Sequence, residues 1–109
     1  MVGAVVVIVA GALVALTGLL GSIGRLPRNR LAGVRTAATM RSDEAFVAGN
    51  RAAGPPIVLG GLVAVAGGVA VLFGAGKPAI IPGVVIMVVL ALVGASRANR
   101  AALRRSGPL

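Results

Sequence analysis

The residues of this chain that could do chemistry are mostly arginines. The chain has 109 residues with no cysteine and no histidine, and its only acidic residues are Asp43 and Glu44. Thiolates, imidazoles and paired carboxylates are the usual metal ligands and acid–base groups. We therefore expect no catalytic residue, no metal site and no cofactor, and we predict that the protein is not an enzyme.

The best-defined polar pattern lies in residues 29–54. Ser42 is a suitable N-cap for a helix, Asp43 and Glu44 complement the positive end of that helix, and Gly54 would stop it. Arginines here could make charge-assisted contacts to a protein or an anionic ligand. The candidate binding residues are Asn29, Arg30, Gly33, Arg35, Thr36, Glu44, Phe46, Asn50 and Arg51.

A plainer interpretation of the same pattern stays open. The arginines would then only orient the protein and touch anionic lipid, at about 1 kcal/mol each. Gly33 would permit a turn, and Glu44 would compensate a helix dipole. The length and definite chemistry of the segment favour binding, because a shorter basic turn would orient the chain equally well.

Three uncharged blocks flank these residues. No charged residue occurs in residues 1–24, 52–76 or 78–96, and hydrophobic residues make up 58% of the chain. A helix needs about 20 apolar residues to cross the hydrocarbon of a bilayer. So short a soluble chain has too little interior to bury so many apolar side chains. The blocks therefore predict three transmembrane helices.

The basic residues predict the direction of threading. With three crossings, ten arginines fall on one side of the membrane, and Lys77 alone falls on the other. The positive-inside rule puts the arginines in the cytoplasm and the N-terminus outside. A cleavable signal peptide is the alternative for the first block, but no basic residue precedes it. The net charge of +9 could also indicate nucleic-acid binding, which the lack of interleaved aromatic residues disfavours.

Prolines and glycines set the expected element boundaries. Pro55 and Pro56 would open the second span, and Pro82 would either begin the third helix or kink its first turn. The predicted fold is all-α, a single multi-pass domain of the plasma membrane. It has three spanning helices and a short interfacial cytoplasmic helix. The spans are about 2–22, 56–74 and 79–96, with a cytoplasmic loop at 24–54 and a cytoplasmic tail at 97–109.

Small residues recur four apart within the spans, as Gly60, Ala64 and Gly68 do. This spacing lets helix backbones approach closely in lipid. It fits packing within one chain, and it also fits a homo-oligomer. We favour packing within the chain.

The polar segment resembles the SdpI-type family of small bacterial integral membrane proteins. The family signature is similar to Asn-Arg-x-x-Gly-x-Arg-Thr, then Thr, then Ser-x-Glu-x-Trp, then His-Arg-x-x-Gly. The matching residues are Asn29, Arg30, Gly33, Arg35, Thr36, Thr39, Ser42, Glu44, Arg51 and Gly54. Phe46 stands where the family usually has tryptophan, and Asn50 stands where histidine is common.

The resemblance implies a role but no chemistry. The family is named for an immunity protein that protects a bacterium from its own secreted toxin. That protein also signals by drawing a cytoplasmic repressor to the membrane. It is longer than this chain, which resembles its C-terminal portion.

We therefore predict an SdpI-like, non-enzymatic immunity or signalling-type binding protein that acts through its arginine-rich cytoplasmic loop. The expected partners are anionic lipids of the bilayer, a cytoplasmic or membrane protein, or a second copy of the chain; nucleic acid is not expected. The alternative is a structural or accessory subunit of a larger membrane complex. A small transporter is disfavoured, because the spans hold no ionisable residue for proton coupling.

Overall fold

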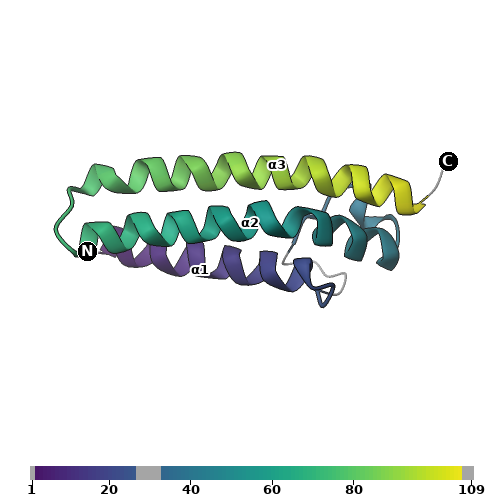
Figure 1. Ribbon diagram of the computed structural model, residues 1–109, viewed down its shortest axis with the longest axis horizontal. Coiled ribbons are helices and arrows are strands. Elements are labelled where there is room, and N and C mark those ends of the chain that lie inside the picture. The colour runs from purple at the N-terminus through teal and green to yellow at the C-terminus, as the bar shows by residue number, and fades with distance from the viewer. Residues whose placement is uncertain (1, 27–32, 107–109) are drawn as a thin grey trace.

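Three long helices lie side by side and form an elongated bundle (Figure 1). The structure is a computed structural model and describes residues 2–26 and 33–106. Helix α2 contacts both α1 and α3, whereas α1 and α3 barely touch each other. The predicted all-α fold with three spanning helices is confirmed. The elements are α1 (Val2–Ser22), η1 (Thr39–Arg41), α2 (Asp43–Leu72), η2 (Lys77–Ala79) and α3 (Ile80–Ser106).

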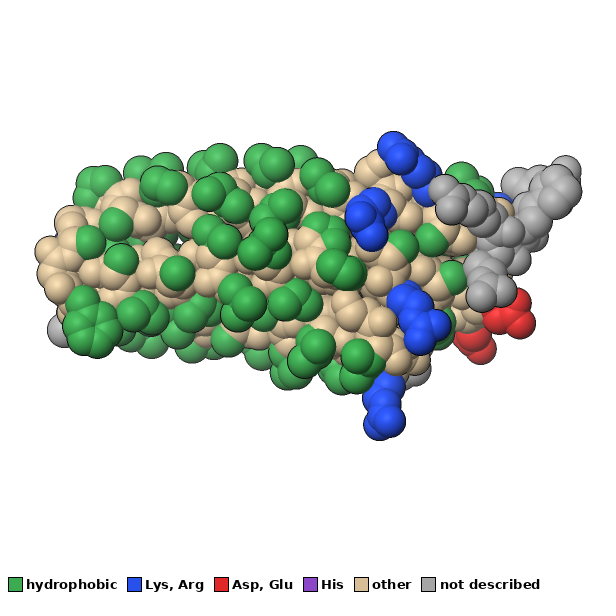
Figure 2. All heavy atoms as spheres, in the orientation of Figure 1, with side chains coloured by type: hydrophobic (Ala, Val, Ile, Leu, Met, Phe, Trp, Pro, Cys, Tyr) green, Lys and Arg blue, Asp and Glu red, His purple; other side chains and the backbone are tan. Residues whose placement is uncertain are grey.

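The surface of the bundle is apolar over most of its length (Figure 2). In the described part of the chain, three helices are long and apolar enough to cross a membrane. Large apolar side chains such as Leu13, Leu62 and Leu92 are more than half exposed. Leaving such a surface in water would be costly, because burying each side chain of this size gains about 1.5–3 kcal/mol. The hydrocarbon core of a bilayer is the environment that this surface fits.

Two helix ends share one hydrogen-bond pattern that only glycine adopts easily. Gly24 after α1 and Gly74 after α2 have φ angles of 73° and 107°. The Gly24 N–H donates to the Gly21 carbonyl at 3.1 Å, and the Arg25 N–H donates to the Leu20 carbonyl at 2.9 Å. This is the Schellman motif, in which a residue in the left-handed region satisfies the last helical carbonyls. Each of these ends is therefore set locally by sequence.

The start of α2 also follows from sequence, but its length does not. Ser42 caps the helix, and its Oγ accepts from the Ala45 N–H at 3.0 Å. We expected a separate interfacial helix that stopped at Gly54. That boundary is wrong, because α2 runs unbroken from Asp43 to Leu72 through Pro55 and Pro56.

A bond from α3 explains how α2 continues past Pro56, and close packing explains why a glycine stands at position 54 without ending the helix. Proline lacks the N–H that would bond the carbonyl four residues earlier, so Pro56 leaves the Ala52 carbonyl without its helical donor. Arg97 of α3 replaces that donor, with its Nε 2.8 Å from the Ala52 oxygen. Gly54 serves close packing: a Cβ there would lie 2.6 Å from the Gly18 carbonyl oxygen of α1.

Helix α3 begins and ends differently from the expected span. It starts at Ile80, so Pro82 lies in its first turn, where a missing N–H leaves no intrahelical bond unmade. It continues to Ser106, well beyond the expected end of the span at residue 96. Residues 97–106 are mostly alanine and arginine, which are strong helix formers. Most of the expected tail is therefore helix.

Small residues bring the helices together. Ideal Cβ atoms would lie 2.7 Å from the Gly61 carbonyl oxygen at Gly11 and 3.1 Å from the Met87 Cα at Gly60. Gly60, Ala64 and Gly68, the predicted stripe on α2, are all buried inside the bundle. This stripe therefore packs α2 against its two neighbours within the chain, as close approach between membrane helices requires.

Candidate functional site

Residues 33–54 fold over one end of the bundle, and we call them the cap. The cap consists of a short irregular segment, η1 and the first three turns of α2. It contacts α3 as well as α2, because η1 lies against both helices. Most of the predicted site residues lie in it. Asn29 and Arg30 lie outside the described residues.

Asn50 fastens the irregular segment to α2. Its Oδ1 accepts from the Val34 N–H at 2.6 Å, and its Nδ2 donates to the Val34 carbonyl at 3.2 Å. Nδ2 also donates to the Phe46 carbonyl at 3.0 Å. The side chain is only 3% exposed. A buried amide is stable when its donors and acceptor are paired, so Asn50 has a structural role inside the cap.

Gly33 fits between Asn50 and the aromatic ring of Phe46. Its φ of 92° lies in the region that glycine adopts without strain. A Cβ there would lie 2.7 Å from Asn50 Oδ1 and 3.2 Å from Phe46 Cζ. Phe46 is fully buried, and Leu26 beside it is nearly so. These residues form a small apolar core beneath the loop.

Two threonines connect the loop to α3. The Thr36 N–H donates to Thr39 Oγ1 at 2.8 Å, and the Thr39 hydroxyl donates to the Val34 carbonyl at 2.9 Å. The Thr36 hydroxyl donates to Asn99 Oδ1 on α3. Thr39 is fully buried. The loop is thus held to two helices by polar side chains.

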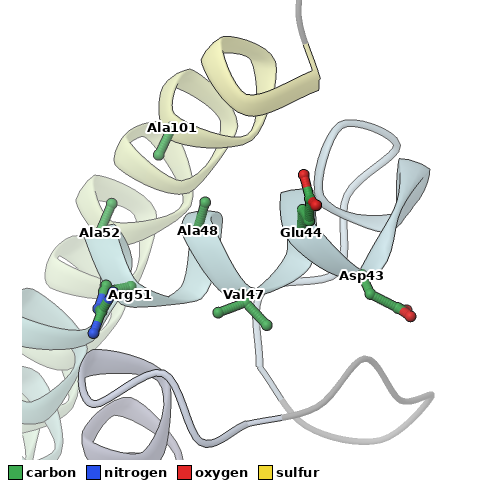
Figure 3. A pocket seen from close by; sticks show the side chains of 7 residues that line it. All are labelled: Asp43, Glu44, Val47, Ala48, Arg51, Ala52 and Ala101. Atoms are coloured by element: carbon green, nitrogen blue, oxygen red, sulfur yellow. The ribbon is translucent and has the colours of Figure 1, made fainter.

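An open groove of about 800 Å³ runs between the cap and α3. Figure 3 shows Ala48 and Ala52 of α2 pointing toward Ala101 of α3, while Arg51 points toward the end of α1. The three alanines have small side chains, so a partner could approach both walls closely. The lining residues are Asp43, Glu44, Val47, Ala48, Arg51, Ala52 and Ala101. Both acidic residues of the chain therefore line this groove.

Exposed arginines lie at the base of the cap. Figure 2 shows basic side chains gathered where the apolar surface ends, with the acidic side chains beyond them. Arg25, Arg51, Arg97 and Arg100 are all exposed. Within residues 2–26 and 33–103, no ion pair joins any of the four to an acidic residue. We call this end of the bundle the basic end.

The structure divides the predicted binding residues into two groups. Gly33, Thr36, Phe46 and Asn50 build the interior of the cap. Arg35, Glu44 and Arg51 remain exposed and can meet a ligand. Fewer side chains are therefore available to a ligand than the sequence pattern suggested.

Sequence reasoning missed Asn99 and Arg97. Asn99 stands among alanines and arginines, and nothing near it in sequence indicates a partner on the loop. Arg97 had a detectable signal, because Pro56 leaves the Ala52 carbonyl without its helical donor, so that a donor from outside α2 is needed.

Comparison with models of protein families gives a match over most of the chain. A model of the SdpI/YfhL protein family matches residues 25–96, which include the whole cap, α2 and most of the apolar part of α3. The chain belongs to the SdpI/YfhL protein family. As a member with three apolar helices, it is a multi-pass membrane protein. No curated protein and no solved structure matches this SdpI/YfhL chain.

Proposed function

We propose that this SdpI/YfhL family member is a non-enzymatic binding protein of the immunity or signalling type. In this proposal the cap faces the cytoplasm and holds a helical segment of a cytoplasmic protein in its groove. The arginine excess at the basic end supports the orientation through the positive-inside rule. Family membership supports the type of role.

The groove is the observation that carries the proposal. Its walls are the alanine faces of α2 and α3, which suit the close approach of a third helix. Asp43 and Glu44 stand at its outer end and Arg51 at the other. In a chain of net charge +9, an acidic edge is distinctive, and it favours a segment with a basic residue at that end.

The hydrogen bonds inside the cap support the same role. Asn50, Thr36 and Thr39 are occupied by bonds within the cap and to α3, so they hold the groove walls in place. A preformed groove loses little conformational entropy when a partner binds. Orienting the chain in the membrane would not need a hydrogen-bonded cap.

Site-directed cross-linking tests the proposal, because the chain has no native cysteine. Single cysteines at Ala48 and Ala101 would carry a maleimide–benzophenone photo-cross-linker in intact cells. Matched controls are Ala37→Cys, exposed on the cap outside the groove, and Ala66→Cys, exposed on the apolar face of α2. We expect one discrete protein adduct from both groove positions and from neither control.

A second measurement connects the adduct to signalling. The identified protein should move from the soluble to the membrane fraction when the wild-type chain is expressed. Glu44→Gln should reduce that shift by up to about fivefold, the effect of losing one exposed charge pair. Equal cross-linking at groove and control positions, or a soluble fraction that never changes, would refute the proposal.

A further inference from the structure

One face of α2 packs against no other helix of the described residues. Arg51, Pro55, Leu59, Leu62 and Ala66 are all exposed, and they recur at spacings of three and four residues on one side of the helix. The faces that carry the buried glycines pack against α1 and α3 instead. This stripe is about 22 Å long at 1.5 Å per residue, enough to cover a lipid acyl chain in one leaflet.

One flank of the stripe ends in two arginines from different helices. The guanidinium of Arg51 lies against Gly24, since a Cβ there would be 3.5 Å from Arg51 Nη2. Arg25 follows Gly24 directly and is exposed. Both arginines therefore stand near the end of α1, and neither pairs with an acidic side chain among the described residues.

The other flank ends in Arg97. Its Nε is fixed to the Ala52 carbonyl, one residue beyond Arg51 on α2. An arginine has five N–H donors, and this bond uses one of them. No other described residue bonds this guanidinium. The remaining donors are thus held in position without a bonding partner.

We propose that Arg25, Arg51 and Arg97 bind the phosphate of an anionic phospholipid. The acyl chain of this lipid lies along Pro55, Leu59 and Leu62. Guanidinium groups suit phosphate oxygens because their donors can bind two oxygens at once. The site opens directly onto the apolar stripe, which a free phosphate ion would leave uncovered. A phospholipid would place its phosphate on the arginines and its acyl chain on the apolar stripe. This inference does not depend on the proposed protein partner.

The test uses a tryptophan reporter, because the chain has no native tryptophan. Leu59→Trp would place one beside the acyl chain, about 12 Å from Arg51 along α2. The full-length variant is reconstituted in vesicles that contain a brominated lipid, which quenches nearby tryptophan. Brominated phosphatidylglycerol is compared with brominated phosphatidylcholine of the same chain length.

A matched reporter separates specific from general lipid contact. Leu92 is exposed on α3, and Leu92→Trp would place the second reporter there. Its depth in the membrane is similar to that of Leu59, because Met87 lies beside Gly60 and Gly94 lies beside Ile57. We expect the anionic lipid to quench the Leu59 reporter preferentially. At the Leu92 reporter the two lipids should quench about equally.

Removing single arginines then locates the headgroup. Arg51→Gln and Arg25→Gln should each lower the preference at the Leu59 reporter by about fivefold, corresponding to about 1 kcal/mol per basic residue. Lys77→Gln, at the opposite end, should change nothing. Circular dichroism verifies that each variant remains folded, and Arg51→Lys gives a second, milder variant with partial loss expected.

Three results would overturn the inference. The first is equal quenching of the Leu59 reporter by the two lipids in the wild-type background. The second is an unchanged preference in both Gln variants. The third is loss of the preference when millimolar inorganic phosphate is added, which would assign the arginines to a free anion.

Discussion

The side-chain amide of Asn50 pairs with both polar atoms of the Val34 backbone, much as a neighbouring peptide group would. The Val34 N–H donates to Oδ1 at 2.6 Å, and Nδ2 donates to the Val34 carbonyl at 3.2 Å. One side chain of α2 thereby gives the Val34 N–H its acceptor and adds a second donor to the Val34 carbonyl, which also accepts from the Thr39 hydroxyl. The shape of the cap depends on this pair.

We predict that Asn50→Ala loosens the cap while the spanning helices stay intact. Removing the amide leaves the part-buried N–H of Val34 without its acceptor, which costs about 1–3 kcal/mol. Amide hydrogen exchange at Val34 should accelerate by a factor of about 5 to 150. Asn50→Asp keeps an acceptor but places a carboxylate against two carbonyl oxygens, so it should be at least as disruptive. Unchanged exchange in both variants would contradict this role.

We predict that Gly33→Ala destabilises the protein more than Gly74→Ala does. Both positions have positive φ, so both variants carry the backbone strain of about 1–2 kcal/mol. Only at Gly33 would the new Cβ meet Asn50 and Phe46; at Gly74 nothing lies within 4 Å. The difference between their free energies of unfolding in detergent measures the contact. Equal losses would mean that Gly33 is needed for its φ alone.

We predict that the basic end is cytoplasmic, which follows from charge and can be measured directly. Phe73 is highly exposed at the end of the bundle opposite the basic end, and Ala37 is exposed on the cap. Each is replaced by cysteine in a separate variant. A membrane-impermeant maleimide should label the Phe73 variant in intact cells. It should label the Ala37 variant only after permeabilisation. The reverse pattern would invert the topology.

How far the sequence predicts the structure depends on the range of the interaction. The three spans follow from runs of uncharged residues, and the helix ends at Gly24 and Ser42 follow from local chemistry. The Gly54 boundary fails because a donor from α3, distant in sequence, restores the bond that Pro56 removes. The candidate residues Gly33 and Asn50 were found by pattern, but their role inside the cap depends on their meeting in space. Asn99 gave no signal, because its partner Thr36 lies in the irregular segment of the cap, far away in sequence.

We predict that Arg97 and Pro56 are energetically coupled although they lie on different helices. Arg97→Leu removes the donor to the Ala52 carbonyl, and a lost bond to a charged group costs about 1.5–3 kcal/mol. In a Pro56→Ala background the helix regains its own N–H for that carbonyl. Arg97→Leu should then cost much less, and a double-mutant cycle measures the difference.

Two controls make the cycle decisive. Arg100→Leu, one turn further along α3, removes an exposed arginine that makes no bond to α2 in the described chain, so it should show no coupling to Pro56. Pro56→Ala alone should keep the fold, because alanine is the best helix former. A coupling energy near zero for Arg97 would mean that water or lipid satisfies the Ala52 carbonyl equally well. A coupling of about 1 kcal/mol or more would establish that α3 supplies the bond that Pro56 removes from α2.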